Sequence, residues 1–352
     1  MKKVILCLLA ALCLILVSGC NKAKGYEIAF VTDIGQLKDK SFNQGTWEGV
    51  EKFAKENNKT YKYYQPANGD SATDEDRAAA MNAAITNGAK IVVCAGFMQA
   101  TALEKVAKAN PKVKFVFIDG WAMGLENITA VVFKEEQSGY LAGYAAVMEG
   151  YTKLGFSGGG GGTNPACQRF GYGYIQGAND AAKAKDITVT MNYTWKYGES
   201  FSGSPELKTL LDGWYSVNGI EVVFTCGGSI CNNAFAAASE NNGKVIGVDV
   251  DQSSASNTVI TSATKGLSAG TIYALEQFYN GKWADISDKT ANLGVESNAV
   301  GLPTETWSMQ NFTVEKYTEL FNKIKDGSIV IDNVVEGAET KTYSNVTLNY
   351  IQ

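Results

Sequence analysis

The sequence has no histidine and only five prolines among its 352 residues. Without an imidazole, Ser-His-Asp and Cys-His nucleophile pairs and His-ligated zinc are excluded. No side chain titrates near neutrality unless its surroundings shift its pKa strongly. The absence of histidine therefore leaves only enzymes that work with carboxylates or lysines, and it places no limit on binding proteins.

Clusters of positive charge are also lacking. The chain has 31 basic and 36 acidic residues, a formal charge of -5, and no block of Lys and Arg. This balance argues against a nucleic-acid binder, which needs clustered cations for phosphate. The 45% hydrophobic content excludes a disordered or collagen-like chain and suffices for two buried cores. We therefore expect two lobes.

The first segment reads as an export signal. A basic start, Met1-Lys2-Lys3, precedes an uncharged apolar run at residues 4–17 and the ending Leu16-Val17-Ser18-Gly19-Cys20. The run is shorter than the roughly 20 residues of a membrane-spanning helix, and the ending matches a bacterial lipobox. We predict a signal peptide at 1–19, a diacylglyceryl anchor on Cys20 and a tether at 20–25; the alternative is a signal peptide with an incidental cysteine.

Removal of the signal leaves a mature chain with 29 basic and 36 acidic residues, a formal charge of -7, because Lys2 and Lys3 are lost. Four cysteines then remain beside Cys20, and their spacing is not that of a zinc site. Cys226 and Cys231 are the nearest pair for a disulfide, although a glycine turn and a helix start between them can hold the thiols apart.

Short apolar runs alternate with helical patterns along the mature chain. Runs such as Lys90-Ile-Val-Val-Cys94 and Val222-Val-Phe-Thr225 are continuous, as in parallel strands that are covered on both faces. A capping-box pattern at Thr73-Asp-Glu-Asp and helical spacing at residues 313–325 mark helices between and after them. This alternation predicts an α/β fold. Ligands of such sheets bind beyond the carboxyl ends of the strands.

Three motifs invite an enzymatic interpretation. Residues 158–162 are five consecutive glycines, but neither a Walker nor a Rossmann pattern surrounds them, so we expect a flexible turn. Residues 171–177 nearly match Gly-x-Gly-x-x-Gly, and we expect close helix packing there. The segment from Asp33 to Asp39 is weakly similar to the aspartate cluster of calcium-dependent nucleoside hydrolases but lacks their adjacent aspartate pair.

A longer resemblance begins at Val31-Thr-Asp-Ile-Gly-Gln-Leu-Lys-Asp-Lys-Ser-Phe-Asn-Gln-Gly45. This segment resembles the opening of the basic membrane protein family of substrate-binding lipoproteins, whose best-understood type is a purine nucleoside receptor. Further similar segments follow in order over about the whole mature length: Phe117-Ile-Asp-Gly120, Phe133-Lys-Glu-Glu-Gln-Ser-Gly-Tyr-Leu-Ala-Gly-Tyr-Ala-Ala146, Lys153-Leu-Gly-Phe-Ser-Gly-Gly159, residues 170–178, Gly247-Val-Asp-Val-Asp-Gln252 and Thr261-Ser-Ala-Thr-Lys265.

The resemblance implies a two-lobed type I periplasmic-binding-protein fold with the ligand in the cleft between the lobes and the chain crossovers as hinges. We place an N-terminal lobe at 26–127 plus about 251–288. The C-terminal lobe then takes 128–250 plus about 289–352.

Family positions also imply roles for aromatic and polar side chains. Phe42 and Phe201 match the residues that sandwich the base, and such stacking contributes about 1–3 kcal/mol per base. Phe42 alternatively belongs to the core. Phe201 precedes Ser202-Gly-Ser-Pro205, where the family commonly has Asp-Pro, which puts the local register in question.

The polar positions complete the implied site. Asp119 matches the residue that reads the base edge, with Asn43 as its complement, and an ionised acceptor contributes about 1.5–3 kcal/mol. Asp249 matches the aspartate that accepts from both ribose hydroxyls, and the sugar is approached by Lys265 and the backbone of Gly227 and Gly228. Asp33 also belongs to the implied site. Helix capping is the alternative for Asp33 and Asp249.

We therefore expect a lipid-anchored, non-enzymatic and monomeric receptor on the extracytoplasmic face of the cell membrane. The resemblance implies a purine nucleoside as its ligand, an ABC-type permease as its partner, and no cofactor or metal. A sugar receptor of the same fold and a calcium-dependent nucleoside hydrolase are the alternatives.

Overall fold

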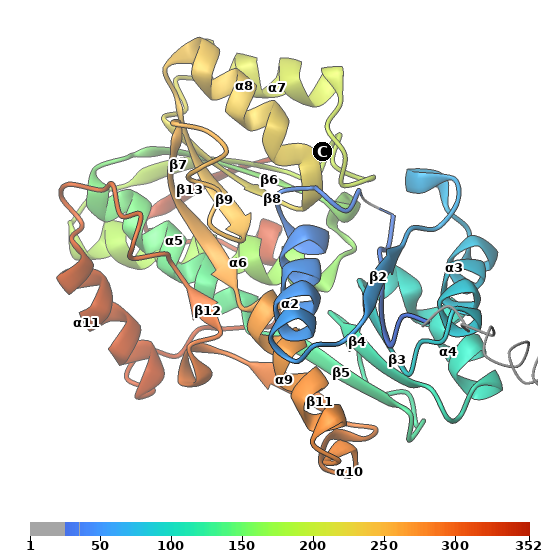
Figure 1. The fold of residues 1–352 in the computed structure, drawn as a ribbon. Coiled ribbons are helices and arrows are strands. Elements are labelled where there is room, and N and C mark those ends of the chain that lie inside the picture. Colours follow the sequence, from blue (N-terminus) through green and yellow to red (C-terminus); the bar gives the residue numbers. More distant parts are fainter. Residues whose placement is uncertain (1–24, 35) are drawn as a thin grey trace, which may run out of the picture.

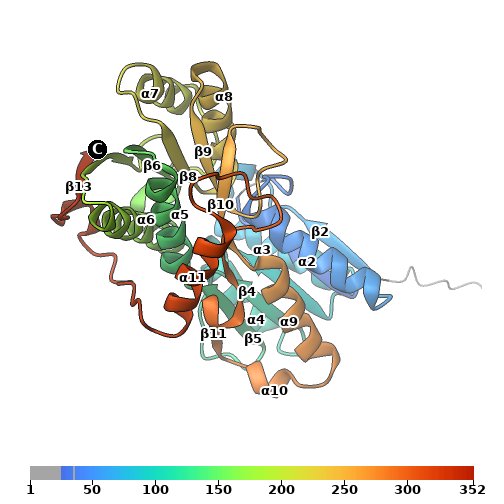
Figure 2. The ribbon, with the colours of Figure 1, turned by 90° about the vertical axis from the view of Figure 1, so that its left-hand side faces the viewer.

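Two β-sheets, each with helices on both sides, make up the chain (Figures 1 and 2). The computed structural model describes residues 25–34 and 36–352; the predicted signal peptide, Cys20 and tether residues 20–24 lie outside the described residues. Within the described residues, no helix is both long and apolar enough to cross a bilayer.

The first sheet has six strands in the order β11-β5-β4-β3-β1-β2, and all its pairs are parallel. In chain order they are β1 (Ile28–Val31), β2 (Tyr61–Tyr64), β3 (Ile91–Ala95), β4 (Lys114–Ile118), β5 (Ile128–Phe133) and β11 (Thr290–Leu293). β1 and β3 are completely buried, as expected for apolar strands that are covered on both faces.

The second sheet has seven strands in the order β12-β10-β9-β8-β6-β7-β13, in which only the pair β10 and β12 is antiparallel. In chain order they are β6 (Lys153–Gly158), β7 (Val189–Thr194), β8 (Val222–Cys226), β9 (Lys244–Asp249), β10 (Val259–Lys265), β12 (Val300–Gly301) and β13 (Val346–Ile351). β13 brings the end of the chain back to the edge of this sheet (Figure 2).

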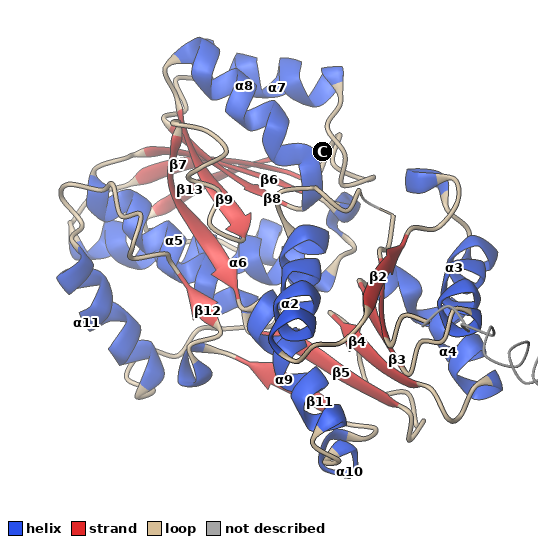
Figure 3. Ribbon diagram, viewed as in Figure 1, coloured by secondary structure: helices blue, strands red, loops and turns tan. Residues whose placement is uncertain are grey.

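Helices fill the layers between and outside the sheets (Figure 3). They are α2 (Phe42–Glu56), α3 (Asp74–Thr86), α4 (Ala100–Ala109), α5 (Glu135–Glu149), α6 (Pro165–Ala184), α7 (Pro205–Ser216), α8 (Cys231–Asn241), α9 (Leu267–Tyr279), α10 (Trp283–Ile286) and α11 (Val314–Lys325). One continuous core joins the α2 and α9 face of the first sheet to the α5 and α6 face of the second. Smaller cores lie under α3 and α4 and under α7 and α8.

The expected fold class, a two-lobed α/β architecture, is confirmed. Several local predictions are confirmed with it. Thr73 and Asp76 form the capping box of α3, and Thr313 caps α11. The glycine-rich stretch at 171–177 packs α6 against α5, where a Cβ on Gly177 would stand 2.0 Å from the Tyr140 carbonyl oxygen. Cys226 and Cys231 are both free thiols, so the disulfide between them is not formed.

The strand pairing differs from the expected lobe boundaries in three places. β5 and β11, which we had assigned to the C-terminal lobe (128–250 and 289–352), pair within the first sheet. β10, which we had assigned to the N-terminal lobe (251–288), pairs with β9 in the second. The chain therefore crosses after β5, after β10 and after β11, one strand later than expected in each case. An isolated apolar strand does not reveal which sheet it joins, because both sheets bury their strands equally.

The three crossovers lie together. The Lys134 backbone N–H donates to the Leu293 carbonyl at 2.9 Å, and its Nζ pairs with Glu296 at 2.8 Å. The Gly266 N–H donates to the Ala299 carbonyl at 2.6 Å. These bonds join three segments that are far apart in sequence into one narrow bridge between the sheets.

Candidate functional site

The nine predicted ligand contacts line one cavity at the carboxyl ends of both sheets. The space between its lining atoms is about 620 Å³ including the open mouth. The first sheet and α2 contribute Asp33, Phe42, Asn43 and Asp119, and the second lobe contributes Phe201, Gly227, Gly228, Asp249 and Lys265. The structure thus brings all nine together, although the first and the last of them are more than 230 residues apart in the sequence.

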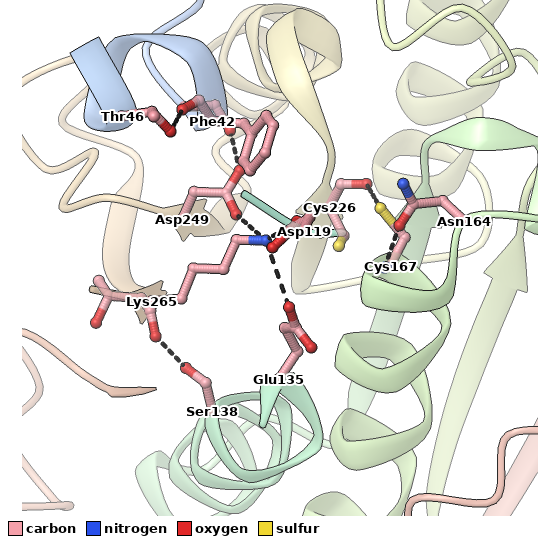
Figure 4. A network of polar contacts seen from close by, with 12 residues as sticks. Phe42, Thr46, Asp119, Glu135, Ser138, Asn164, Cys167, Cys226, Asp249 and Lys265 are labelled. Atoms are coloured by element: carbon pink, nitrogen blue, oxygen red, sulfur yellow. Dashed lines mark hydrogen bonds and ion pairs between the residues drawn. The ribbon is translucent and has the colours of Figure 1, made fainter. Parts of the chain in front are cut away.

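Two strand-end aspartates face each other across this cavity. Asp119 follows β4 with φ of 56°, and Asp249 ends β9 with φ of 68°. Left-handed backbone is uncommon for residues other than Gly, Asn and Asp, and here it turns both carboxylates toward the second lobe's Lys265 (Figure 4). Asp249 also accepts from the Ser41 hydroxyl at 2.5 Å. Capping is not its role, because it lies in no helix start.

Asp39 accepts hydrogen bonds from the backbone N–H groups at the start of α2. Its carboxylate accepts from the backbone of Ser41, Asn43 and Gln44 at 2.8–3.1 Å. The Asn43 amide nitrogen donates to both Asp39 and Asp33, at 3.2 and 3.0 Å. These bonds fix the orientation of the amide, and its oxygen remains buried without a donor.

Lys265 is the positive centre of the site. Its Nζ lies 2.5 Å from Asp119, 3.4 Å from Glu135 and 3.7 Å from Asp249 (Figure 4). Glu135 in turn accepts from Arg169 Nε at 2.6 Å. The buried ammonium is therefore surrounded by three carboxylates, one of which shares its charge with a second cation.

Burial and this network shift the pKa values of the cluster. Burial raises the pKa of Asp119 to about 6 against the opposing effect of Lys265. Burial also raises the pKa of Asp39 to about 6 and raises that of Asp249. Burial of Lys265 opposes its charge, but the surrounding carboxylates outweigh this effect, so its pKa is raised and it stays an ammonium. Such perturbed groups in a cavity are typical of functional sites.

Phe42 is half-buried and lies between the main core and the cavity. Its ring packs against the main core and also lines the cavity, with Lys265 Nζ 4.9 Å from the ring centroid. The exposed part of the ring therefore belongs to the cavity wall.

Phe201 lies on a platform of glycine backbone. A Cβ on Gly159 would stand 2.5 Å from its ring, and one on Gly160 would stand 2.8 Å away. The residue itself has φ of 59°, and its carbonyl accepts from the Ser229 N–H at 2.9 Å. The glycine run that we had expected to be only a flexible turn is thus the surface against which an aromatic cavity wall rests.

Three hydrogen bonds join the lobes around the mouth. The Ser202 hydroxyl donates to Asp70 at 2.7 Å, and Gln252 Nε2 donates to the Lys40 carbonyl at 2.7 Å. Lys40 Nζ donates to Asn232 at 3.4 Å. Ser202 is the residue at which this chain departs from the family pattern, and it lies in a bond across the mouth.

Sequence reasoning missed four polar members of the site: Asp39, Ser41, Glu135 and Arg169. Glu135 lies in the segment at residues 133–146 that resembles the family, but nothing in the sequence indicates its contact with Lys265. Among the described residues, no group of three or more His, Cys, Asp or Glu is arranged to hold a metal ion. The Asn43 amide nitrogen donates to both Asp33 and Asp39. It therefore occupies the position between the two carboxylates that a bound cation would take.

Comparisons with known proteins point to one family. Residues 27–334 match the family model Bmp, described as ABC transporter substrate-binding protein PnrA-like. The chain is 30% identical over 328 residues to the ABC transporter nucleoside-binding protein BmpA of Lactococcus lactis, covering 87% of this chain and 88% of that protein. It is 30% identical over 295 residues to basic membrane protein B of Borreliella burgdorferi, covering 80% and 82%.

Solved structures share the fold. An ABC transporter solute-binding protein from Aeropyrum pernix superposes with a TM-score of 0.70 at 21% identity, covering 89% of this chain and 90% of that one. One from Conexibacter woesei superposes with a TM-score of 0.66 at 20% identity, covering 88% and 99%.

Proposed function

The chain belongs to the Bmp family of PnrA-like ABC transporter substrate-binding proteins, and from that premise we propose that it is a lipid-anchored, extracytoplasmic receptor for purine nucleosides. It closes two lobes on one nucleoside and delivers it to an ABC-type permease. It acts as a monomer and catalyses no reaction.

The observation that carries this proposal is a pair of buried acceptors without donors. Among the described residues that line the cavity, Asn43 and Asp119 each have a buried Oδ1 atom without a hydrogen-bond partner. Leaving such atoms unpaired costs about 1–3 kcal/mol each, so the ligand is expected to supply N–H donors. The edge of guanine or adenine does so, while its flat faces suit the Phe42 and Phe201 rings on the same wall.

The second lobe suits the sugar. Asp249 lies at the carboxyl end of β9, and its Oδ1 is 3.7 Å from Lys265 Nζ. A carboxylate accepts from two neighbouring hydroxyls, and an ammonium donates to a ribose oxygen. The backbone of Gly227 and Gly228 leaves room for the sugar because neither residue has a side chain.

The charges in the cavity favour a neutral ligand. Four carboxylates and one lysine line it, and the lysine is already surrounded by Asp119, Glu135 and Asp249. A phosphate group would have to enter among like charges, and in the part of the chain that the structure describes no second cation lines the cavity. The site therefore selects nucleosides over nucleotides.

Calorimetric titration tests the ligand class. We expect heat from guanosine, inosine and adenosine, weaker or no heat from cytidine, and none from guanosine 5′-monophosphate or ribose. Absence of heat with every nucleoside would refute the proposal. Binding of ribose alone would favour a sugar receptor, and release of free base would favour a hydrolase.

Mass spectrometry tests ligand and anchor independently. A freshly purified closed protein retains its ligand in a native spectrum, so the mass difference identifies a nucleoside. Denatured protein from membranes should carry a diacylglyceryl group on Cys20, and Cys20→Ser should abolish membrane retention. An unmodified Cys20 would refute the anchor and leave the ligand proposal untouched.

A further inference from the structure

We propose that the amino edge of the first sheet is a membrane-contact face that binds anionic phospholipid headgroups. The face consists of Tyr26, Lys59, Lys62, Lys90 and Lys112, at the edge where these strands begin. The proposal rests on the proposed lipid anchor, and the face is remote from the ligand cavity.

The topology brings these residues to one edge. β1, β2, β3 and β4 are neighbouring parallel strands, so their first residues lie side by side: Ile28 pairs in register with Tyr61 and with Ile91, and Ile91 with Lys114. The ligand cavity is lined by residues that follow the other ends of these strands. The membrane-contact face and the cavity therefore lie on opposite edges of the sheet.

The chain leaves the described structure within this face. The Gly25 carbonyl accepts from the Thr60 hydroxyl at 2.8 Å, and the Tyr26 N–H donates to the Asn87 carbonyl at 3.0 Å. Five residues, 21–25, separate Cys20 from Tyr26. They reach at most about 18 Å when extended, so an acylated Cys20 keeps this edge close to the bilayer surface.

The chemistry of the face suits a phospholipid surface. Tyr26 is 40% exposed, and Lys62 Nζ lies 5.4 Å from the centroid of the Tyr26 ring and 5.3 Å from that of the Tyr64 ring. Amphipathic tyrosine rings at headgroup level and lysines toward phosphate are the usual interfacial pair.

The face is basic although the chain as a whole is acidic. Of its four lysines, Lys90 pairs with a carboxylate: Glu27 accepts from Lys90 Nζ at 2.5 Å. The adjoining end of α2 adds one charge of each sign, Lys55 and Glu56. With a formal charge of -5 for the whole chain, positive charge is concentrated beside the tether.

The second sheet supplies a matched control. Its strands β6 and β9 also begin with lysines, Lys153 and Lys244. Glu221 accompanies them there and accepts from the Lys153 backbone N–H at 2.9 Å. These lysines share the strand-start position but lie in the lobe that does not carry the tether.

Lysine footprinting of the full lipoprotein tests the proposal. The protein is bound to vesicles of phosphatidylcholine, or of phosphatidylcholine with phosphatidylglycerol, and labelled with an acetylating reagent. On the anionic vesicles, labelling of Lys62 and Lys112 should fall at least about threefold relative to the neutral vesicles, whereas Lys153 and Lys244 should change little. High salt should remove the difference.

The double variant Lys62→Glu with Lys112→Glu should lose the protection of Lys90, with an unchanged circular dichroism spectrum as the folding control. If the protein co-floats with anionic vesicles but Lys62 and Lys112 are protected no more than Lys153 and Lys244, the membrane-contact face alone is overturned. Failure to co-float with either vesicle would instead overturn the proposed anchor and with it the premise of this face.

Discussion

Replacement of Asp119 by Asn separates ligand recognition from folding. The change removes the negative charge and keeps the shape, so Lys265 still has Glu135 at 3.4 Å and Asp249 at 3.7 Å. Burial of the charged carboxylate is unfavourable and raises its pKa to about 6, so removal of the charge also removes this unfavourable contribution. We therefore expect the free energy of unfolding to change by no more than about 1 kcal/mol.

Nucleoside affinity should respond much more strongly. A charge-assisted hydrogen bond contributes about 1.5–3 kcal/mol, and each 1.4 kcal/mol is a factor of ten, so Asp119→Asn should weaken guanosine binding about 10- to 150-fold. Calorimetry gives the affinity and thermal unfolding checks the fold. Asp285→Asn, on α10 of the same lobe and away from the cavity, is the matched control and should bind as the wild type does.

The same variant has a pH signature. Because the pKa of Asp119 is about 6, the acceptor is ionised above that pH and protonated below it. Wild-type affinity should therefore fall as the pH drops through 6, by about fivefold between pH 6 and 5 when only the ionised form binds. Asp119→Asn should lose most of this dependence. A variant that binds guanosine within twofold of the wild type would remove Asp119 from the base edge.

Stability and kinetics give further predictions. The pKa of Asp39 is raised to about 6, so the folded state binds more protons than the unfolded state between about pH 4 and 6. The unfolding temperature should therefore rise on acidification from pH 7 to 5, and it should rise less in Asp39→Asn. An equal rise in the variant and the wild type would contradict the raised pKa of Asp39. Gly159→Ala pushes a Cβ to 2.5 Å from the Phe201 ring and should weaken nucleoside binding about tenfold, while Gly213→Ala, with no atom within 4 Å of its Cβ, should not. Ser202→Ala removes a bond across the mouth and should speed ligand release about 2- to 10-fold in stopped-flow fluorescence; an unchanged rate would mean that this bond does not hold the mouth closed.

The fold was predictable because its signals are local. Apolar runs such as 91–95 and 114–118 specify buried parallel strands, and caps such as Thr73 and Thr313 specify where helices begin. The exchange of β5, β10 and β11 between lobes was not predictable, since strand partners depend on how the whole chain packs.

The candidate site shows the same division. Residues at the carboxyl ends of strands, such as Asp119 and Asp249, could be placed at the ligand-binding edge of a sheet from the strand pattern, and the resemblance to the family added the rest. The roles of Glu135 and Arg169 depend on contacts over more than 30 residues, to Lys265 and to each other. The glycine run was misleading in isolation, because its purpose is the space it leaves for Phe201.

The position of Lys265 beside a crossover has a mechanical consequence. A rotation of one lobe about the bridge at Lys134, Gly266 and Glu296 moves each atom in proportion to its distance from that bridge. Lys265 and Glu135 are next to it in sequence, so their short lever arms keep them nearly stationary, whereas the Ser202 and Asp70 partners at the mouth have long ones. A displacement of a fraction of an ångström around the ammonium therefore accompanies a much larger separation at the mouth, so the mouth can open while the cluster around Lys265 stays nearly intact.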